Sequence, residues 1–109
     1  MRIRQWEIWK CKPEGFEREH WFVLISGQER LDAARFHQVN GLVCYTLRGQ
    51  PASTDVLLNS ADGFQAVTVC QCDLAFILDK RKLHSNIGTV SWERQQCIKG
   101  KLKEVLRLS

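Results

Sequence analysis

Hydrophobic positions in this chain fall into short runs separated by polar turns, and the strongest run lies within residues 20–27. Residues 21–25 are all apolar and include β-branched and aromatic types, and Ser26-Gly27 ends the run. A run this short, with these residue types, predicts a strand buried on both faces and not a helix. His20 then lies at the start of this buried strand, at the edge of the core. A rigid strand end positions a side chain better than a loop does, so we expect the chemistry of the chain near this residue.

Shorter runs elsewhere predict the rest of a sheet. Residues 3–10 alternate large apolar and polar side chains, which predicts an opening strand with a bend or bulge near Trp6. Further strands are predicted at residues 39–47, 55–58, 64–72 and 74–78, with Thr46 beside the turn that ends the first of these. Five or six short strands at this spacing predict a small, strongly bent sheet or partial barrel.

One long helix is predicted near the end of the chain. Ser91 is a good N-cap residue, and Glu93 follows in the first turn, where the helix dipole favours an anion. A single apolar stripe then runs along the helix, formed by Ile98, Leu102, Val105 and Leu106. This face is expected to pack on the sheet or on a partner. Residues 31–36 allow only a short helical turn.

Length and composition bound the class of protein. At 109 residues, with 44% hydrophobic and 26% charged side chains, the chain fits one soluble domain spanning residues 1–109. The charged N-terminus has no apolar run behind it, so no signal peptide is expected, and no run approaches the roughly 18 apolar residues of a membrane span. A cytoplasmic location, with no membrane partner, is the simplest expectation.

Charge and cysteine content narrow the chemistry. Residues 79–109 carry eight Lys or Arg against three Asp or Glu, which accounts for the net charge of +4. This excess predicts either a solvated helix face or a surface for phosphate or an acidic partner. The five cysteines have no disulfide framework and only one close pair, Cys70 and Cys72, so they are expected to be reduced and no metal site is predicted.

Several short motifs follow one another along nearly the whole chain. They are residues 5–9, residues 20–26, the strand ending at Thr46, the strand at 55–58, Asp79-Lys80-Arg81-Lys82-Leu83, and Ile87-Gly88-Thr89-Val90-Ser91 before the closing helix. In this order the chain resembles the MazF/PemK-type toxins of bacterial toxin–antitoxin systems, whose superfamily also includes the CcdB-type gyrase poisons. The family's Asp-Lys-x-Arg-Leu and Ile-Gly-x-Leu-Ser patterns match the last two motifs.

This resemblance implies a fold and a set of partners. The implied fold is mainly β with α: a β-barrel-like, SH3-like bent antiparallel sheet plus a C-terminal helix, in a single domain. It also implies a growth-inhibiting toxin that cleaves single-stranded RNA at selected sequences without metal or other cofactor. The implied assembly is a homodimer, neutralised by a small antitoxin protein in the groove that RNA would use.

The residues that the resemblance assigns to catalysis are partly replaced in this chain. Family members rely on an Arg-Pro pair and a strand-end Thr; Thr46 retains the Thr, whereas His20 and Trp21 occupy the Arg and Pro positions. Leu74 and Phe76 occupy positions where the family has Gln and Arg.

RNA cleavage by its own 2′-hydroxyl needs a base, an acid and stabilisation of the phosphorane oxygens. His20 supplies either proton-transfer role near neutral pH, and Thr46 would donate a hydrogen bond to phosphate. Arg18 or Arg48 would supply the permanent charge, and Trp21 a surface on which a base stacks. In the structural alternative, His20 is a histidine at the start of a strand that hydrogen-bonds to backbone, and Thr46 is an ordinary β-branched strand residue.

Two functions therefore remain open. The first is a metal-independent endoribonuclease with His20 and Thr46 as catalytic residues. The second is a non-catalytic member of the fold that binds a protein target or an antitoxin. The chain ends Leu108-Ser109 without the terminal Trp of the CcdB-type poisons, which disfavours gyrase poisoning in particular.

Overall fold

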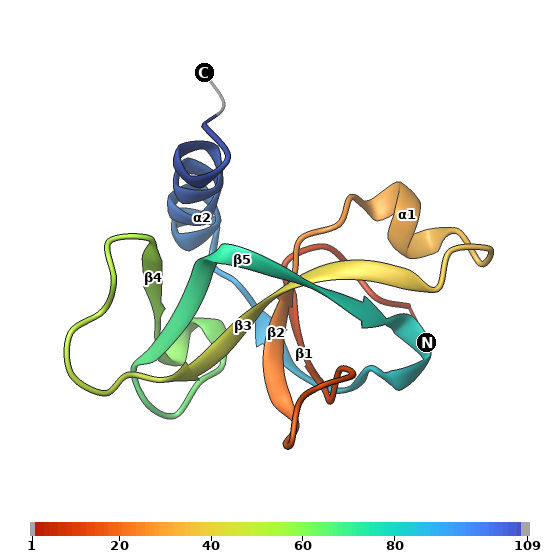
Figure 1. Cartoon of the computed structure of the whole chain (residues 1–109), viewed down its shortest axis with the longest axis horizontal. Coiled ribbons are helices and arrows are strands. Elements are labelled where there is room, and N and C mark those ends of the chain that lie inside the picture. Colours follow the sequence, from red (N-terminus) through yellow and green to blue (C-terminus); the bar gives the residue numbers. More distant parts are fainter. Residues whose placement is uncertain (1, 108–109) are drawn as a thin grey trace.

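A curled six-stranded antiparallel sheet with one long helix packed against it forms the molecule, whose computed structural model describes residues 2–107 (Figure 1). The elements are β1 (Glu7–Cys11), β2 (His20–Leu24), α1 (Gln28–Asp32), β3 (Gln38–Thr46), β4 (Asp55–Leu58), η1 (Ser60–Asp62), β5 (Thr68–Asp79), η2 (Lys80–Lys82), β6 (His84–Thr89) and α2 (Trp92–Val105). The chain end at Leu108-Ser109, named above for its lack of Trp, lies outside the described residues.

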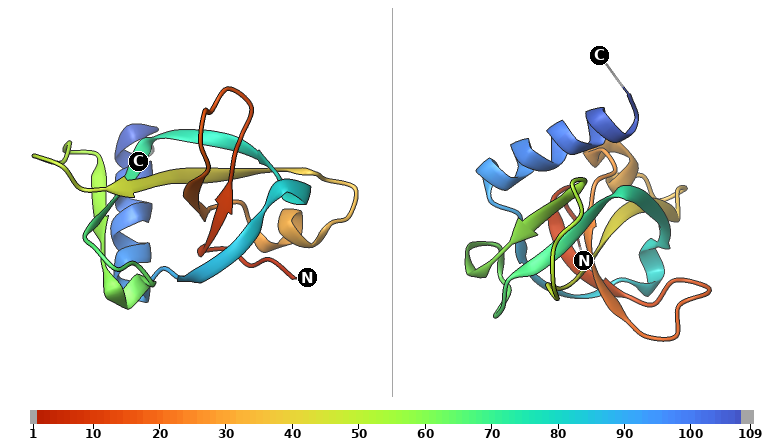
Figure 2. Two further views of the ribbon diagram at one scale, coloured as in Figure 1. Left: turned by 90° about the horizontal axis from the view of Figure 1, so that it is seen from below. Right: turned by 60° about the vertical axis from the view of Figure 1, so that its left-hand side comes forward.

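The strand order is β4-β5-β3-β2-β1-β6, and each neighbouring pair is antiparallel. β3 and β5 form the longest ladder, from Gln38 opposite Asp79 to Thr46 opposite Thr68, which a register shift between Leu42 and Cys44 interrupts. The strands curl as Figure 2 shows, and α2 lies along one side of them. The bent antiparallel sheet with a C-terminal helix is thus confirmed.

Strand alternation divides the core into two clusters, one on each face of the sheet. The cluster that includes Ile98 of α2 also contains Ile8, Val23, Leu42, Val56, Leu58 and Cys70. The other contains Trp9, Phe22, Leu24, Val43 and Leu78. β2 contributes to both clusters, because Phe22, Val23 and Leu24 are all fully buried. This confirms the strand with two buried faces predicted from residues 21–25, although β2 itself ends at Leu24.

Two predictions about strands were wrong. The runs at 64–72 and 74–78 were predicted as separate strands, but both fall largely within the single twelve-residue strand β5. Asp73 lies where the β3–β5 register shifts, and β5 continues through this irregularity as one strand, so the polar residue marks a bulge and not the end of a strand. β6 was not predicted at all, because His-Ser-Asn-Ile-Gly-Thr has the composition of a loop and becomes a strand only by pairing with β1.

The opening strand begins later than predicted. Residues 5 and 6 form a turn, Trp6 has a positive φ of 75°, and pairing starts at Glu7. The bend near Trp6 is therefore confirmed. The helical turn expected within 31–36 lies earlier, as α1.

The predicted closing helix is confirmed as α2, with Ser91 in the N-cap position, although its side chain makes no capping hydrogen bond. Ile98 is fully buried and Leu102 packs beside it. Leu106, at the end of the predicted stripe, is 62% exposed, because α2 extends past the sheet that its first turns cover.

Gly100 offers a stability test within α2. A methyl group added at Gly100 would meet no atom within 4 Å. We expect Gly100→Ala to stabilise the protein by about 0.5–1 kcal/mol, because alanine loses less conformational entropy in a helix. Urea denaturation measures the change.

Gly63→Ala is the matched contrast. Gly63 has φ 105°, and a Cβ there would lie 2.4 Å from the carbonyl oxygen of Ile87. The same substitution should therefore destabilise the protein. Equal changes in stability at the two positions would contradict both the open surroundings assigned to Gly100 and the close backbone contact assigned to Gly63.

Candidate functional site

A groove opens where β3 ends, between the β2–β3 pair, the chain segment that follows η1, and β6. We call it the Thr46 groove; its volume is about 420 Å³, and its lining includes Trp21, Thr46, Phe64, Gln65, Thr68 and Ile87. The groove therefore combines an aromatic surface with hydroxyl and amide groups.

Register brings Trp21 and Thr46 into this groove together. Trp21 pairs with Cys44 across the β2–β3 ladder, and Thr46 lies two residues farther along β3. Since side chains two residues apart on a strand share a face, Trp21, Cys44 and Thr46 point to the same side of the sheet. Trp21 is partly buried and Thr46 is exposed, so the hydroxyl is open to a ligand that covers the indole.

The wall opposite β3 is fixed by a tight backbone contact. Gly63 approaches the backbone of Ile87 closely, and Asp62 beside it accepts hydrogen bonds from the backbone N–H groups of Asn59 (3.0 Å) and Ser91 (2.7 Å). Asp62 is only 1% exposed. A buried carboxylate thus ties this wall to the start of α2.

His20 leaves β2 on the other face. Its ladder partner in β1 is Cys11, which belongs to the core cluster opposite that of Val23 and Cys44. The imidazole contacts the ring of Phe16 edge-on, with centroids 5.4 Å apart. Within residues 2–107, no hydrogen bond engages its ring nitrogens.

The backbones of His20 and Thr46 are thus close, but their side chains point in opposite directions. Because Trp21 pairs with Cys44, His20 lies beside Tyr45, one residue from Thr46, on strands about 4.8 Å apart. The two side chains leave from opposite faces at the same end of the β2–β3 pair. The structure groups Thr46 with Trp21, and groups His20 with Phe16.

An aromatic cluster holds the loop between β1 and β2 against the sheet. Phe16 from this loop lies 5.9 Å from Phe22 and 5.0 Å from Phe76, all in edge-on geometry. Phe76 occupies the position where the resemblance places an Arg. Packed aromatic rings therefore occupy the position at which family members are expected to carry a positive charge.

The two predicted arginines lie apart from the groove lining. Arg18, in the loop before β2, and Arg48, in the turn after β3, are both exposed, and neither has an ion pair or hydrogen bond from its side chain within the described part of the chain. They stay proposed phosphate-binding residues.

Lys10 is a residue that sequence reasoning missed. It pairs with Trp21 across β1–β2, and its ammonium lies 5.3 Å from the centroid of the indole. A cation held on the aromatic surface that borders Thr46 supplies positive charge next to the groove. Its place as a polar residue of the opening strand was visible in the sequence, but its partner depends on strand register.

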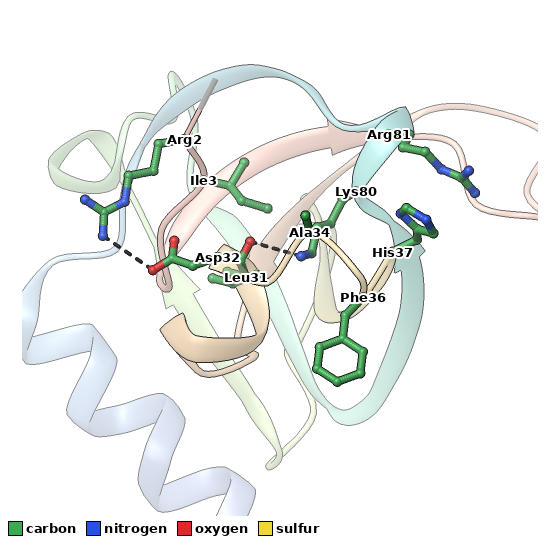
Figure 3. A pocket seen from close by; sticks show the side chains of 9 residues that line it. All are labelled: Arg2, Ile3, Leu31, Asp32, Ala34, Phe36, His37, Lys80 and Arg81. Atoms are coloured by element: carbon green, nitrogen blue, oxygen red, sulfur yellow. Dashed lines mark hydrogen bonds and ion pairs between the residues drawn. The ribbon is translucent and has the colours of Figure 1, made fainter.

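The basic run after β5 is mostly engaged in holding the fold. Lys80 donates hydrogen bonds to the carbonyl oxygens of Arg30 (2.7 Å), Leu31 (3.0 Å) and Ala33 (2.9 Å), at the end of α1. Figure 3 shows its ammonium directed at this part of the backbone. Arg81 binds Asp79 through both carboxylate oxygens, and these hydrogen bonds lower the pKa of Asp79 to about 2.

Three buried cysteines lie beneath the groove. Cys44 faces Cys70 across the β3–β5 ladder, and Cys72 is in the same cluster. The pKa of Cys70 is raised well above its usual value by a hydrogen bond with Cys44 and by burial, and that of Cys72 is raised by a hydrogen bond with Cys70 and by burial. The Cys70 and Cys72 thiols therefore stay protonated at neutral pH and act as small core side chains, not as nucleophiles.

In residues 2–107, no set of three or more His, Cys, Asp or Glu side chains is arranged to hold a metal ion. The helices described there are too short or too polar to span a bilayer.

Solved structures with the same fold are numerous. An endoribonuclease in complex with its cognate antitoxin, from a mycobacterial species, superposes with a TM-score of 0.83 at 20% identity, over 98% of this chain and 97% of that one. The Mycobacterium tuberculosis toxin MazF-mt6 gives a TM-score of 0.80 at 13% identity, over 94% and 98% of the two chains. MazF in a MazE–MazF crystal from Deinococcus radiodurans gives 0.78 at 15%, over 100% and 99%.

Comparison of the sequence with protein-family models and with curated proteins gives no match. At these identities the structural likeness establishes the fold: the chain has the fold of the MazF-type endoribonuclease toxins.

Proposed function

We propose that the protein is a cytoplasmic toxin of a toxin–antitoxin pair that cleaves single-stranded RNA at selected sequences without a metal ion. The observation that carries this proposal is the Thr46 groove, in which Trp21 and Thr46 share one face on a fold common to MazF-type endoribonucleases. Lys10, stacked on Trp21, adds the cation that a phosphate backbone requires.

In the proposed reaction the 2′-hydroxyl attacks the adjacent phosphorus. The bond to the 5′-oxygen breaks and the proton lost by the 2′-hydroxyl is balanced by one delivered to that oxygen, which leaves a 2′,3′-cyclic phosphate and a 5′-hydroxyl. Thr46 donates a hydrogen bond to a phosphate oxygen, and a base stacks on Trp21. Arg18 and Arg48, on the flanking loops, contact neighbouring phosphates.

His20 is the proposed proton-transfer group. Two observations support this role: within residues 2–107 its imidazole nitrogens make no hydrogen bond, and it lies at the start of β2. Because its side chain and that of Thr46 lie on opposite faces, only some substrate paths reach both. A phosphodiester that crosses the ends of β2 and β3, and not one that lies on a single face, would contact Thr46 from one side and His20 from the other.

Exposed apolar side chains and the solved neighbours support two protein partners. Large apolar side chains are exposed on β5 and α2, among them Leu74 (53%), Ile77 (63%) and Trp92 (71%). Exposed apolar surface of this kind is typical of protein contacts. Two of the solved neighbours are described as toxin–antitoxin complexes. A homodimer and a small antitoxin are the partners that we propose for these exposed side chains.

The alternative is a non-catalytic member of the fold that binds an antitoxin or another protein. Phe76 favours it, because it packs against Phe16 and Phe22 where the resemblance places an Arg.

The deciding experiment is incubation of the purified protein with a long RNA in EDTA, followed by mapping of the product ends. We expect discrete cuts with 5′-hydroxyl ends, reduced by a factor of about 100 or more in His20→Ala, as for loss of a general acid or base. Lys103→Ala, an exposed cation on the outer side of α2, is the control and should cut normally. Intact RNA at high protein concentration would leave the non-catalytic function.

A further inference from the structure

A second concave surface lies at the other end of β3, beside α1, and the proposed cleavage site does not use it. Its volume is about 690 Å³, and its lining includes Arg30, Arg35, Phe36, His37, Ile77 and Lys82. We call it the Phe36 hollow. Gln38 and Thr46 begin and end the nine residues of β3, so roughly 26 Å of strand separates the two sites at about 3.3 Å per residue. Figure 1 shows these two ends of β3 at opposite sides of the molecule.

Two guanidinium groups stack on Phe36. The Arg30 guanidinium carbon lies 4.3 Å from the centroid of the ring, and that of Arg35 lies 4.6 Å from it. Arg30 also donates from Nε to the carbonyl oxygen of Gln38 at 2.7 Å. Stacking and this hydrogen bond hold the guanidinium groups in place, which lowers the entropy lost when they bind an anion.

The charge in the hollow is not neutralised locally. Arg30, Arg35 and Lys82 have no carboxylate within ion-pair distance among residues 2–107. Two acidic side chains line the hollow, Glu14 and Asp79, and Asp79 is already bound by Arg81. Lys80, nearby, is engaged by backbone carbonyls, and Arg2 on the far side of α1 pairs with Asp32 at 3.6 Å (Figure 3). The unpaired cations therefore face an open concavity.

We infer that the Phe36 hollow binds single-stranded RNA, as an anchoring site separate from the groove where cleavage is proposed. The inference rests on the proposed RNA-directed function and extends it to a second part of the substrate. The hollow offers the two kinds of group that bind a nucleotide. The fixed guanidinium groups bind phosphate, and the flat faces of the guanidinium groups and of the His37 imidazole stack on bases. An acidic peptide would use only the charge.

The test measures binding without cleavage. The probe is a fluorescent, unstructured 12-nucleotide RNA carrying 2′-O-methyl groups throughout, which cannot be cut because it lacks the attacking hydroxyl. We expect Arg35→Ala to weaken its binding about tenfold, and to lower the slope of log affinity against log salt by about 0.7, as for one lost phosphate contact on a single strand. Arg35 makes no hydrogen bond from its side chain within the described residues, so folding should be unaffected; melting curves check this.

Paired variants make the outcome decisive. Arg35→Lys keeps the charge but loses the planar stacking group, so it should recover the salt slope but not the full affinity. Lys103→Ala should bind as the unmodified protein does. Because the sites are far apart, losses from Arg35→Ala and Trp21→Ala should add.

Three results would overturn the inference or separate it from the proposed function. Unchanged affinity in both Arg30→Ala and Arg35→Ala would overturn it. The second result uses a ten-residue glutamate peptide as the probe. If Arg35→Ala weakens binding of this peptide but leaves RNA affinity unchanged, the hollow is a peptide site and the inference is wrong. If the RNA in EDTA stays intact yet Arg35→Ala weakens binding, the anchoring site stands and cleavage fails.

Discussion

Thr46→Val should lower the rate of RNA cleavage by a factor of about 100 to 1,000 while leaving the fold intact. Valine matches threonine in shape but cannot donate a hydrogen bond, and removal of one donor to a developing phosphorane charge typically costs that factor. Thr46 is exposed, so no buried partner is left unsatisfied. Single-turnover cleavage of a short RNA in EDTA measures the effect.

Thr46→Ser is the control for this substitution, because it keeps the hydroxyl, and it should cleave within about tenfold of the unmodified protein. If Thr46→Val cleaves as fast as Thr46→Ser, the hydroxyl has no catalytic role and the site lies elsewhere. A loss of RNA binding equal to the loss of rate would make Thr46 a binding residue only.

Asp62→Ala should destabilise the protein by roughly 2–4 kcal/mol. The carboxylate is almost fully buried and accepts hydrogen bonds from the backbone N–H groups of Asn59 and Ser91. Its removal leaves two partly buried N–H donors without partners, and each such group costs about 1–3 kcal/mol. Urea denaturation, followed by circular dichroism, measures the change.

Ser60→Ala, in the same turn but exposed, should change stability by less than about 0.5 kcal/mol. A loss below about 1 kcal/mol for Asp62→Ala would show that the turn re-forms without its carboxylate. Because Asp62 connects the groove wall to α2, a partly folded variant should also lose RNA binding before it loses the helix.

The sheet could be predicted because its strands are marked by side-chain type. Residues 21–25 and 55–58 contain apolar runs bounded by turn residues, and both lie in or beside observed strands. β6 carries no such signal, because His84, Ser85 and Asn86 are exposed and only pairing with β1 makes them a strand. Strand pairing between distant segments is a property of the tertiary structure, and composition does not encode it.

The candidate site was predictable in part, from the family resemblance and from the chemistry of its side chains. Thr46 was identified from the family resemblance and Trp21 as an aromatic surface for a base, and both line one groove. That His20 faces the other way follows from the register Trp21 opposite Cys44, and a shift of one residue would reverse it. Lys10 and the stacked pair Arg30 and Arg35 were missed, since each depends on a neighbour far along the chain or on a loop conformation.

The sequence alone determined which segments are strands with buried faces, where the closing helix lies, and that the chain resembles MazF/PemK-type toxins. Hydrophobic burial acts on each segment through its own residue types, so these features are local. The tertiary structure decided which side chains meet: Trp21 with Thr46 and Lys10, His20 with Phe16, and Lys80 with the end of α1. Register and curl of the sheet set these contacts, because a one-residue shift exchanges the two faces of every strand.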